Sequence, residues 1–185
     1  AYTISYDEGG GSFSGKVGSY NIETTDLSLP STGTRTGYTF AGWDVSGANG
    51  AGVAGNGTTN VTIKRGTYGN LTAKAKWSLN TYHLSWNVSH GSHANRTEDF
   101  TVEDCPIAMG EATPYDGYAF TGWSGEKLSA SPSSFTLDAP FLEGKADGAT
   151  LSFTASFSAN PYTIRLHAND GTGAGGLGDT VEHAV

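Results

Sequence analysis

The amino-acid sequence predicts a β-rich α+β fold built from tandem small modules with little helix. The first reason is a repeat, because the heptapeptide at residues 37–43 returns at residues 117–123, 80 positions further along. The second is composition: 27 glycines and only one methionine favour turns and short strands over long helices. The third is the alternation of apolar and polar side chains in short segments, which is typical of half-buried strands.

The first element of each repeat is predicted to be a half-buried strand. Apolar side chains alternate with polar ones at residues 2–7, so the apolar ones share one face of the strand. The same pattern returns at residues 82–88 and 162–168. Turns containing glycine follow all three segments and are expected to end the strands.

Two further short strands are predicted after the first one. They cover residues 19–24 and 27–29, and their counterparts in the second copy cover residues 100–104 and 107–109. The first half of each copy is therefore expected to consist of three short strands joined by turns.

The repeated heptapeptide is predicted to be a turn glycine followed by a strand, with Tyr38 and Phe40 on one face. Strict alternation then places Trp43 on the opposite face from Phe40. Two arrangements remain open. Either a bulge at Gly42 returns the indole to the core, or Trp43 covers the edge of the module.

The segments that follow the heptapeptide differ between the two copies. Residues 47–60 are rich in glycine, alanine and asparagine, whereas residues 124–134 differ from them in length and composition. Both segments are predicted to be variable surface loops. They are where a function specific to one copy is expected.

The second half of each copy is expected to hold two more strands and at most one turn of helix. The strands cover residues 61–63 and 71–77, with counterparts at 135–137 and 151–157. The turns of helix are expected at residues 64–69 and 139–148.

The repeat divides the chain into three predicted domains. Residues 1–80 form a first module, residues 81–160 a second one, and residues 161–185 the start of a third. The linkers are expected at residues 78–81 and 158–161. Their shortness predicts restricted bending between modules.

The charge distribution argues against nucleic-acid binding. The net charge is −8, and residues 81–160 alone carry 3 basic and 10 acidic side chains. An acidic surface without a basic stripe repels phosphate backbones. The sequence shows neither a charged-then-apolar leader nor an apolar run of membrane-spanning length, as expected for a piece of a larger protein.

The order of these motifs resembles the Listeria-Bacteroides repeat, the family of the internalin B-repeats. The residues that carry the resemblance are Tyr-Thr-Ile at 2–4, Leu-x-Leu-Pro at 27–30, Gly-Tyr-x-Phe-x-Gly-Trp at 37–43, Val-Thr-Ile at 61–63 and Ala-Lys-Trp at 75–77. The second copy departs from the pattern, with Phe157 for the terminal tryptophan and glycine for the proline of the second motif.

This resemblance implies β-grasp-like modules on secreted or wall-attached proteins of the bacterial cell surface. It implies a stalk or spacer, or a module that presents an adhesive domain, touching neighbouring repeats and an unknown cell-surface partner. It implies no enzymatic activity and no cofactor, because the family has no shared catalytic residues.

Several short motifs suggest chemistry, but their context argues against each. The sortase-like LPxTG pattern at 29–33 lies in the middle of a strand-rich module. Glycine patterns of the GxGxxG type at 50–55 and 171–176 lack the helix that a dinucleotide site needs. His90 and His93 could hold a metal only if two further ligands converged from elsewhere, and they are predicted to be solvated loop histidines.

Two kinds of covalent chemistry would involve single side chains. Cys105 occupies the position of a threonine in the first copy and is predicted to be a half-buried strand residue, not a catalytic thiol. Lys16, Lys74 and Lys145 are candidates for an isopeptide cross-link to asparagine. That bond requires a buried acid beside the reacting pair.

An alternative function is a module that binds a glycan or a protein. Sugars and proteins often bind to exposed aromatic rings. The candidate contact residues are Tyr68, Trp86, Tyr115 and Trp123. Burial in the core is the competing explanation for the aromatics that recur with the repeat.

Overall fold

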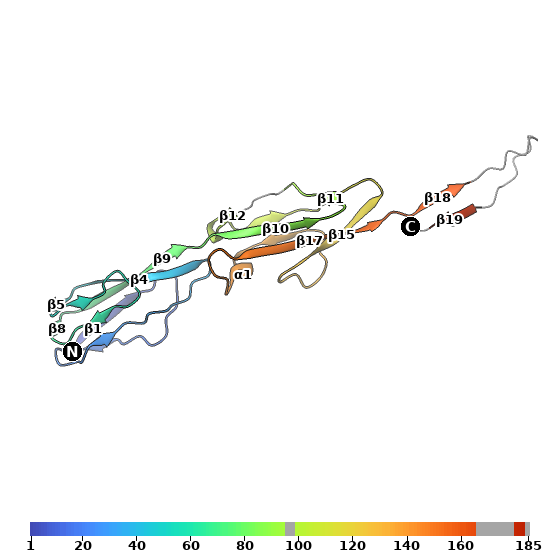
Figure 1. The fold of residues 1–185 in the computed structure, drawn as a ribbon. Helices are drawn as coiled ribbons and strands as arrows, with labels where there is room; N and C mark the ends of the chain where they lie inside the picture. Colours follow the sequence, from blue (N-terminus) through green and yellow to red (C-terminus); the bar gives the residue numbers. More distant parts are fainter. Residues whose placement is uncertain (95–98, 166–179, 184–185) are drawn as a thin grey trace, which may run out of the picture. The chain divides into compact units, whose positions relative to one another are not determined.

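The computed structural model describes residues 1–94, 99–165 and 180–183 (Figure 1). Strands dominate, and only two short helical segments occur in these residues. The β-rich class with little helix is therefore confirmed. We refer to residues 1–80 as the first repeat and to residues 81–160 as the second repeat.

The first repeat contains nine strands and no helix (Figure 1). The strands are β1 (Tyr2–Asp7), β2 (Ser19–Tyr20), β3 (Leu27–Ser28), β4 (Tyr38–Ser46), β5 (Asn49–Gly50), β6 (Val53–Ala54), β7 (Thr62–Ile63), β8 (Thr67–Tyr68) and β9 (Leu71–Leu79). Only β1, β4 and β9 are longer than two residues, and these three carry most of the sheet.

The second repeat adds two short helical segments to a similar set of strands. Its elements are β10 (Tyr82–Val88), β11 (Gly91–Ser92), β12 (Asp99–Phe100), the 3-10 helix η1 (Val102–Asp104), β13 (Ile107–Met109), β14 (Thr113–Pro114), β15 (Tyr118–Gly125), β16 (Phe135–Leu137), α1 (Ala139–Leu142) and β17 (Thr150–Ala159). Beyond it, β18 (Tyr162–Arg165) pairs antiparallel with β19 (Thr180–His183).

Each repeat contains a four-stranded sheet with the same strand order. The orders are β2-β1-β9-β4 and β12-β10-β17-β15. In the first sheet, β1 runs parallel to β9, while β2 and β4 pair antiparallel with their neighbours. The 80-residue period is therefore a period of structure as well as of sequence. The β-grasp-like assignment stays a prediction, since no helix occurs in residues 1–80.

A bulge in β4 decides how the heptapeptide is arranged. The register of β4 against β9 shifts between Phe40 and Gly42, and the same shift occurs between Phe120 and Gly122. Gly42 has a φ of 138°, which few other residues adopt. The bulge turns Trp43 inward, where it is 0 % exposed. Of the two arrangements left open by the sequence, the bulged one is confirmed.

The core of the first repeat lies on the face of the sheet that the alternation predicts. Ile4 on β1 and Leu71, Ala73 and Ala75 on β9 are buried, while the residues between them are exposed. They pack with Trp43 and with apolar residues of the smaller sheets in one cluster. The predicted strand faces are therefore confirmed.

Two predicted strands are shorter than expected, because nearby side chains form hydrogen bonds with the backbone that would otherwise pair in a strand. After β2, the Thr24 hydroxyl accepts a hydrogen bond from Asn21 N, and the Asn21 side chain accepts one from Glu23 N. After β12, Thr101 and Asp104 form a capping box that begins η1. Local side-chain bonds of this kind compete with strand pairing.

The predictions for the second half of each repeat are confirmed in part. A turn of helix at 139–148 is confirmed by α1, but the one at 64–69 is wrong, because β8 pairs there with β5. The loop at 47–60 contains β5 and β6 and is partly strand. The Asn56 side chain fastens it to the backbone N and O of Val45.

Contacts between Cα atoms divide the chain into two compact units. One unit comprises Ala1–Leu84, Thr97–Ile107 and Leu137–Leu151, and the other comprises Ser85–Arg96, Ala108–Thr136 and Ser152–Val185. The first unit therefore contains the entire first repeat together with three segments of the second, at residues 81–84, 97–107 and 137–151.

Candidate functional site

The four aromatic residues predicted to contact a ligand differ in burial. Trp123 is 0 % exposed and lies in the core, and Trp86 is half-buried with its ring stacked on Phe153. Only Tyr68 and Tyr115 are exposed, at 45 % and 58 %, and they belong to different units. Ligand contact by Tyr68 and Tyr115, the two exposed members of the set, stays a prediction.

The buried tryptophan of the first repeat is the centre of an aromatic cluster. The Phe13 ring lies 4.4 Å from Trp43 and 4.8 Å from Phe40, measured between centroids. Trp77 packs against both phenylalanines. The Trp43 indole donates a 2.7 Å hydrogen bond to Pro30 O, so its one polar atom is satisfied. This cluster is a packed core and not an open platform.

The LPxTG pattern belongs to that core. Leu29 is buried, and the carbonyl of Pro30 accepts the bond from Trp43. The equivalent indole, Trp123, donates to Gly110 O at 2.9 Å. The pattern is therefore explained by packing around the tryptophan.

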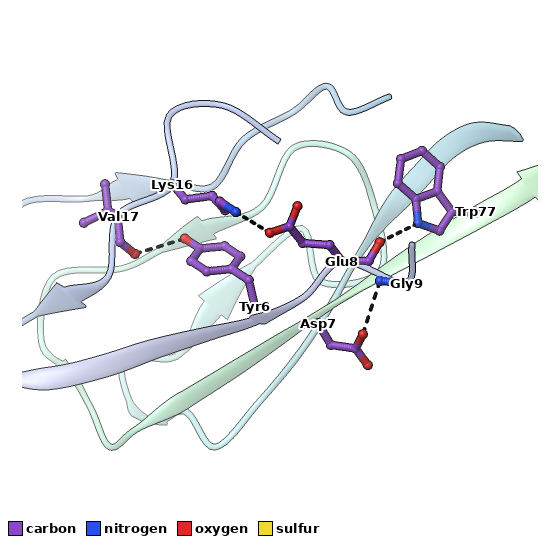
Figure 2. A network of polar contacts seen from close by, with 7 residues as sticks. All are labelled: Tyr6, Asp7, Glu8, Gly9, Lys16, Val17 and Trp77. Atoms are coloured by element: carbon purple, nitrogen blue, oxygen red, sulfur yellow. Dashed lines mark hydrogen bonds and ion pairs between the residues drawn. The ribbon is translucent and has the colours of Figure 1, made fainter. Parts of the chain in front are cut away.

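A polar network closes the loop between β1 and β2. Figure 2 shows the Lys16 ammonium directed at the Glu8 carboxylate, with which it forms an ion pair. The backbone carbonyl of Glu8 accepts a 3.0 Å bond from Trp77 Nε1, and Tyr6 OH donates to Val17 O at 3.1 Å. Burial raises the pKa of Tyr6, which keeps its hydroxyl protonated as a donor. The network holds the loop against β9, and its contacts serve structure and not catalysis.

Glycine lets this loop approach Trp77 closely. A side chain at Gly11 would collide with the indole ring, and one at Gly91 would collide with Phe157 in the second repeat. Gly18, in the same loop as Gly11, has open space around it. The aromatic residue at the end of the closing strand therefore covers a bare backbone in both repeats.

Asn80 is the polar residue that the sequence reasoning missed. It is 3 % exposed, its backbone N donates to Gly37 O at 2.9 Å, and its Oδ1 accepts a 2.7 Å bond from the Thr39 hydroxyl. The bond to Gly37 returns in the second repeat, where Asn160 N donates to Gly117 O at 2.8 Å. The repeat could have indicated this position in the sequence, because the two asparagines are 80 residues apart.

Thr81, directly after Asn80, also forms hydrogen bonds within the first unit. Thr81 N donates to the Asp147 carboxylate at 2.8 Å, and Gly148 N donates to Thr81 O at 2.8 Å. The Tyr38 hydroxyl donates a 2.7 Å bond to Glu103, and this bond raises the pKa of Tyr38. β9 ends at residue 79 and β10 begins at 82, so the junction is two residues long instead of the predicted four.

Comparison with known proteins agrees with these features. Residues 2–76 match the Listeria-Bacteroides repeat domain, and residues 87–161 match the divergent InlB B-repeat domain. The chain belongs to the Listeria-Bacteroides repeat family. Each match contains one copy of the heptapeptide and its buried tryptophan.

A relative of this repeat protein is a putative Gly-rich membrane protein of Evansella cellulosilytica. The two are 25 % identical over 175 residues, which cover 92 % of this chain and 18 % of the relative. The chain therefore spans less than a fifth of that relative's length. No solved structure matches the chain.

The described part of this Listeria-Bacteroides repeat protein shows no arranged catalytic or metal centre. It contains no group of three histidine, cysteine or carboxylate side chains placed to hold a metal ion. Repeat domains of this kind are in general structural modules. None of the helices in the described segments has the length and apolar character needed to cross a membrane.

The single cysteine, Cys105, is not activated as a nucleophile. Burial raises the pKa of the Cys105 thiol, and the nearby carboxylates Asp104 and Asp138 raise it further. A thiol of raised pKa is a poor nucleophile at neutral pH. Cys105 is half-buried as predicted, but it caps η1 and does not lie in a strand.

The isopeptide hypothesis lacks its required acid among the described residues. The buried polar side chains there are Thr67 and Asn80, neither of which is a carboxylic acid. Lys16 instead forms an ion pair with Glu8, and Lys74 is exposed. Lys145 lies in a loop that lines a cavity of about 710 Å³ together with Gly10, Arg35 and other residues of the first unit.

The two histidines of the second repeat differ in environment. His90 is exposed, as predicted, and its ring lies 4.3 Å from that of Tyr118. The prediction is wrong for His93, whose ring lies 4.9 Å from Trp123 and 5.2 Å from Trp86. His93 is part of the aromatic core because it occupies the position of Phe13, 80 residues earlier.

Proposed function

We propose that this chain is a non-catalytic repeat region of a bacterial cell-surface protein that acts as a stalk or spacer. In this proposal, residues 1–80 and 81–160 fold as successive modules outside the cell and place another part of the protein at a distance. Family membership supports a surface repeat protein. The observation that carries the mechanical role is the buried junction residue Asn80.

A spacer works only if its modules do not bend freely. Asn80 is bonded through both its backbone and its side chain, and Thr81 is bonded through N and O. A linker of two bonded residues has little conformational freedom compared with a flexible chain. The recurrence of the Asn–Gly bond at Asn160 supports the same junction after each repeat.

The proposal is tested by measuring the distance between two spin labels, one on exposed Thr25 and one on exposed Ser129. The background variant Cys105→Ser removes the native thiol. We expect a narrow distance distribution in the parent and a broad one after six Gly-Ser residues are inserted behind Asn80. Equally broad distributions in the two proteins would contradict the stalk.

The alternative is a module that binds a cell-surface glycan or protein through exposed aromatic side chains. The exposure of Tyr68 and Tyr115 supports it. Binding to a glycan array or to host-cell protein that is lost in both Tyr68→Ala and Tyr115→Ala would favour this function. Binding that neither substitution changes would leave it without support.

A further inference from the structure

The first unit contains a cavity of about 710 Å³ that is lined mainly by glycines and polar side chains. The lining comes from two glycine-rich segments, residues 10–12 and 33–38, and from the loop at residues 142–146. Small-molecule sites have volumes of about 300 to 1,000 Å³. A spacer does not need such a cavity, and Tyr68 and Tyr115 do not line it. It is therefore a separate candidate site.

The two glycine-rich segments are held in place by the backbone and by the core. Ser12 and Thr34 form an antiparallel bridge, in which Ser12 N donates to Thr34 O at 2.9 Å and Thr34 N donates to Ser12 O at 3.0 Å. A side chain at Gly33 would collide with the ring of Phe13, so the backbone there lies directly on the aromatic cluster. A wall that is already ordered lowers the cost of binding a ligand.

Arg35 brings a positioned guanidinium to this cavity. Its Cζ lies 3.6 Å from the centroid of the Tyr38 ring, and a Cβ at Gly10 would lie 3.6 Å from its Nε. Arg35 is half-buried and forms no ion pair with a carboxylate of the described residues. Stacking on an aromatic ring orients the planar group, whose fork of N–H donors matches both oxygens of a carboxylate.

The other charges at the cavity leave Arg35 as the residue that attracts an anion. Glu143 and Lys145 come from the same loop and have opposite signs, so their charges largely offset each other. Glu103 accepts a bond from the Tyr38 hydroxyl and does not line the cavity. The chain as a whole has a net charge of −8, which repels anions. Binding of an anion here therefore depends on the guanidinium.

The remaining side chains favour a ligand that is rich in hydroxyl groups. The apolar side chains of the lining are Leu142 and Ala146, so it offers little to an apolar molecule. Hydroxyl groups both donate and accept hydrogen bonds, as sugar hydroxyls do. They belong to Ser12, Thr34, Thr36 and Tyr38.

We propose that this cavity binds a carboxylate-bearing sugar, such as a uronic acid unit of an acidic polysaccharide. Arg35 holds the carboxylate through two parallel N–H···O bonds, and the hydroxyl side chains bond to the sugar ring. An acidic peptide also offers carboxylates, but peptides are in general recognised through pockets for apolar side chains or along a strand edge. The lining of this cavity favours the sugar.

The site belongs to the first repeat. Tyr115 lies 80 residues after Arg35, and Tyr118 N donates to Tyr115 O as Tyr38 N donates to Arg35 O. The second repeat therefore has a neutral side chain at the position of the guanidinium. This inference goes beyond the spacer function and does not depend on it, because a chain that bends freely would keep the cavity.

The test is an NMR titration of the full chain with tetragalacturonate and with a hyaluronan tetrasaccharide. The amide resonances of Gly10 and Gly33 and the Nε–H resonance of Arg35 report on the cavity. We expect saturable shifts of these resonances with at least one of the two acidic sugars. Methyl-esterified tetragalacturonate lacks the charge and should bind roughly tenfold more weakly than the free acid, or not at all.

Variants separate the role of Arg35 from general attraction by positive charge. Arg35→Gln should weaken binding roughly tenfold or more, because a charge-assisted bidentate contact is lost. Arg65→Gln is the matched control, since Arg65 lies outside the cavity, pairs with Glu23, and should leave affinity unchanged. Glu143→Gln removes a negative charge from the lining and should strengthen binding about two- to fivefold.

Several results would overturn the proposal. One is the absence of shifts with both acidic sugars at millimolar concentration. Another is equal weakening by Arg35→Gln and Arg65→Gln, which would indicate unspecific attraction. Tighter binding of a tri-aspartate peptide than of either sugar would assign the cavity to acidic peptides instead. If Arg35→Gln does not fold, unchanged or weaker binding by Glu143→Gln overturns it.

Discussion

The two repeats bury the same indole and surround it with different side chains. Trp43 is 0 % exposed beside Phe13, whereas Trp123 is equally buried beside His93. Both indoles donate to a backbone carbonyl, and a glycine bulge precedes each of them. The strand order is also the same. The comparison teaches that a tryptophan, its acceptor and a bulge specify this fold, while the flanking rings are replaceable.

The largest expected effect comes from removing the shared part. Trp43→Ala and Trp123→Ala should each destabilise the altered repeat by about 3 to 5 kcal/mol, because a large side chain is lost from a closed core. Urea unfolding followed at the remaining indoles measures each repeat separately. Tyr68→Ala, on the surface, is the control and should change stability by less than about 0.5 kcal/mol.

The same experiment tests whether the repeats are independent. Simultaneous loss of both repeats in either tryptophan variant would show that stability is shared through the junction. Loss of one repeat alone would support two modules with a modest neighbour term.

The second effect concerns the glycine under the terminal aromatic ring. Gly11→Ala and Gly91→Ala should cost about 1 to 3 kcal/mol each, because a new methyl group collides with the Trp77 ring at residue 11 and with Thr113 O and the Phe157 ring at residue 91. Gly18→Ala and Gly110→Ala are matched controls, since both sites have open space around them. Thermal unfolding of the four variants measures the difference. Equal costs at crowded and open sites would contradict this role for the aromatic ring.

Periodicity alone was enough to predict the elements that depend on local alternation. The strand faces of β1 and β9 are examples, because Ile4 lies two positions from the half-buried Tyr2 and Tyr6, and the buried residues of β9 are two positions apart. Alternation could not decide the direction of Trp43. That direction depends on the bulge and on a 3.1 Å bond from Trp43 N to Thr58 O, a contact between segments distant in sequence.

The junction and the core histidine were missed for a related reason. An asparagine in a linker and a histidine after a glycine turn are both typical of exposed positions. Asn80 is buried because Gly37 and Thr39 supply partners, and His93 is half-buried because it replaces Phe13. In both cases the residue 80 positions away carried more information than the immediate neighbours.

A smaller effect separates Trp77 from its counterpart Phe157. Trp77 Nε1 donates to Glu8 O, a bond that a phenylalanine cannot form. Trp77→Phe should therefore cost about 1 kcal/mol in the first repeat, the usual net value of one hydrogen bond. Denaturant unfolding measures this cost, and the second repeat, unaltered in this variant, serves as the internal control. An unchanged first repeat would show that the indole acts only through its area.

The smallest expected effect compares two exposed aspartates whose pKa values are lowered by different partners. The Lys64 side chain, with help from Arg65 N, lowers the pKa of Asp26, whereas backbone and hydroxyl bonds from Thr101 lower the pKa of Asp104. Stability from a lowered carboxyl pKa is present above the unfolded value, about 3.9, and is lost as the pH falls through the folded value.

These two causes respond differently to salt, and carboxyl NMR titration separates them. Lys64→Met, or about 1 M salt, should move the pKa of Asp26 toward its usual value, because an exposed ion pair is screened. The pKa of Asp104 should move less, since its donors are neutral; Thr101→Val is the change that should raise it. Equal salt responses at both carboxylates would mean that charge, and not the capping box, controls Asp104.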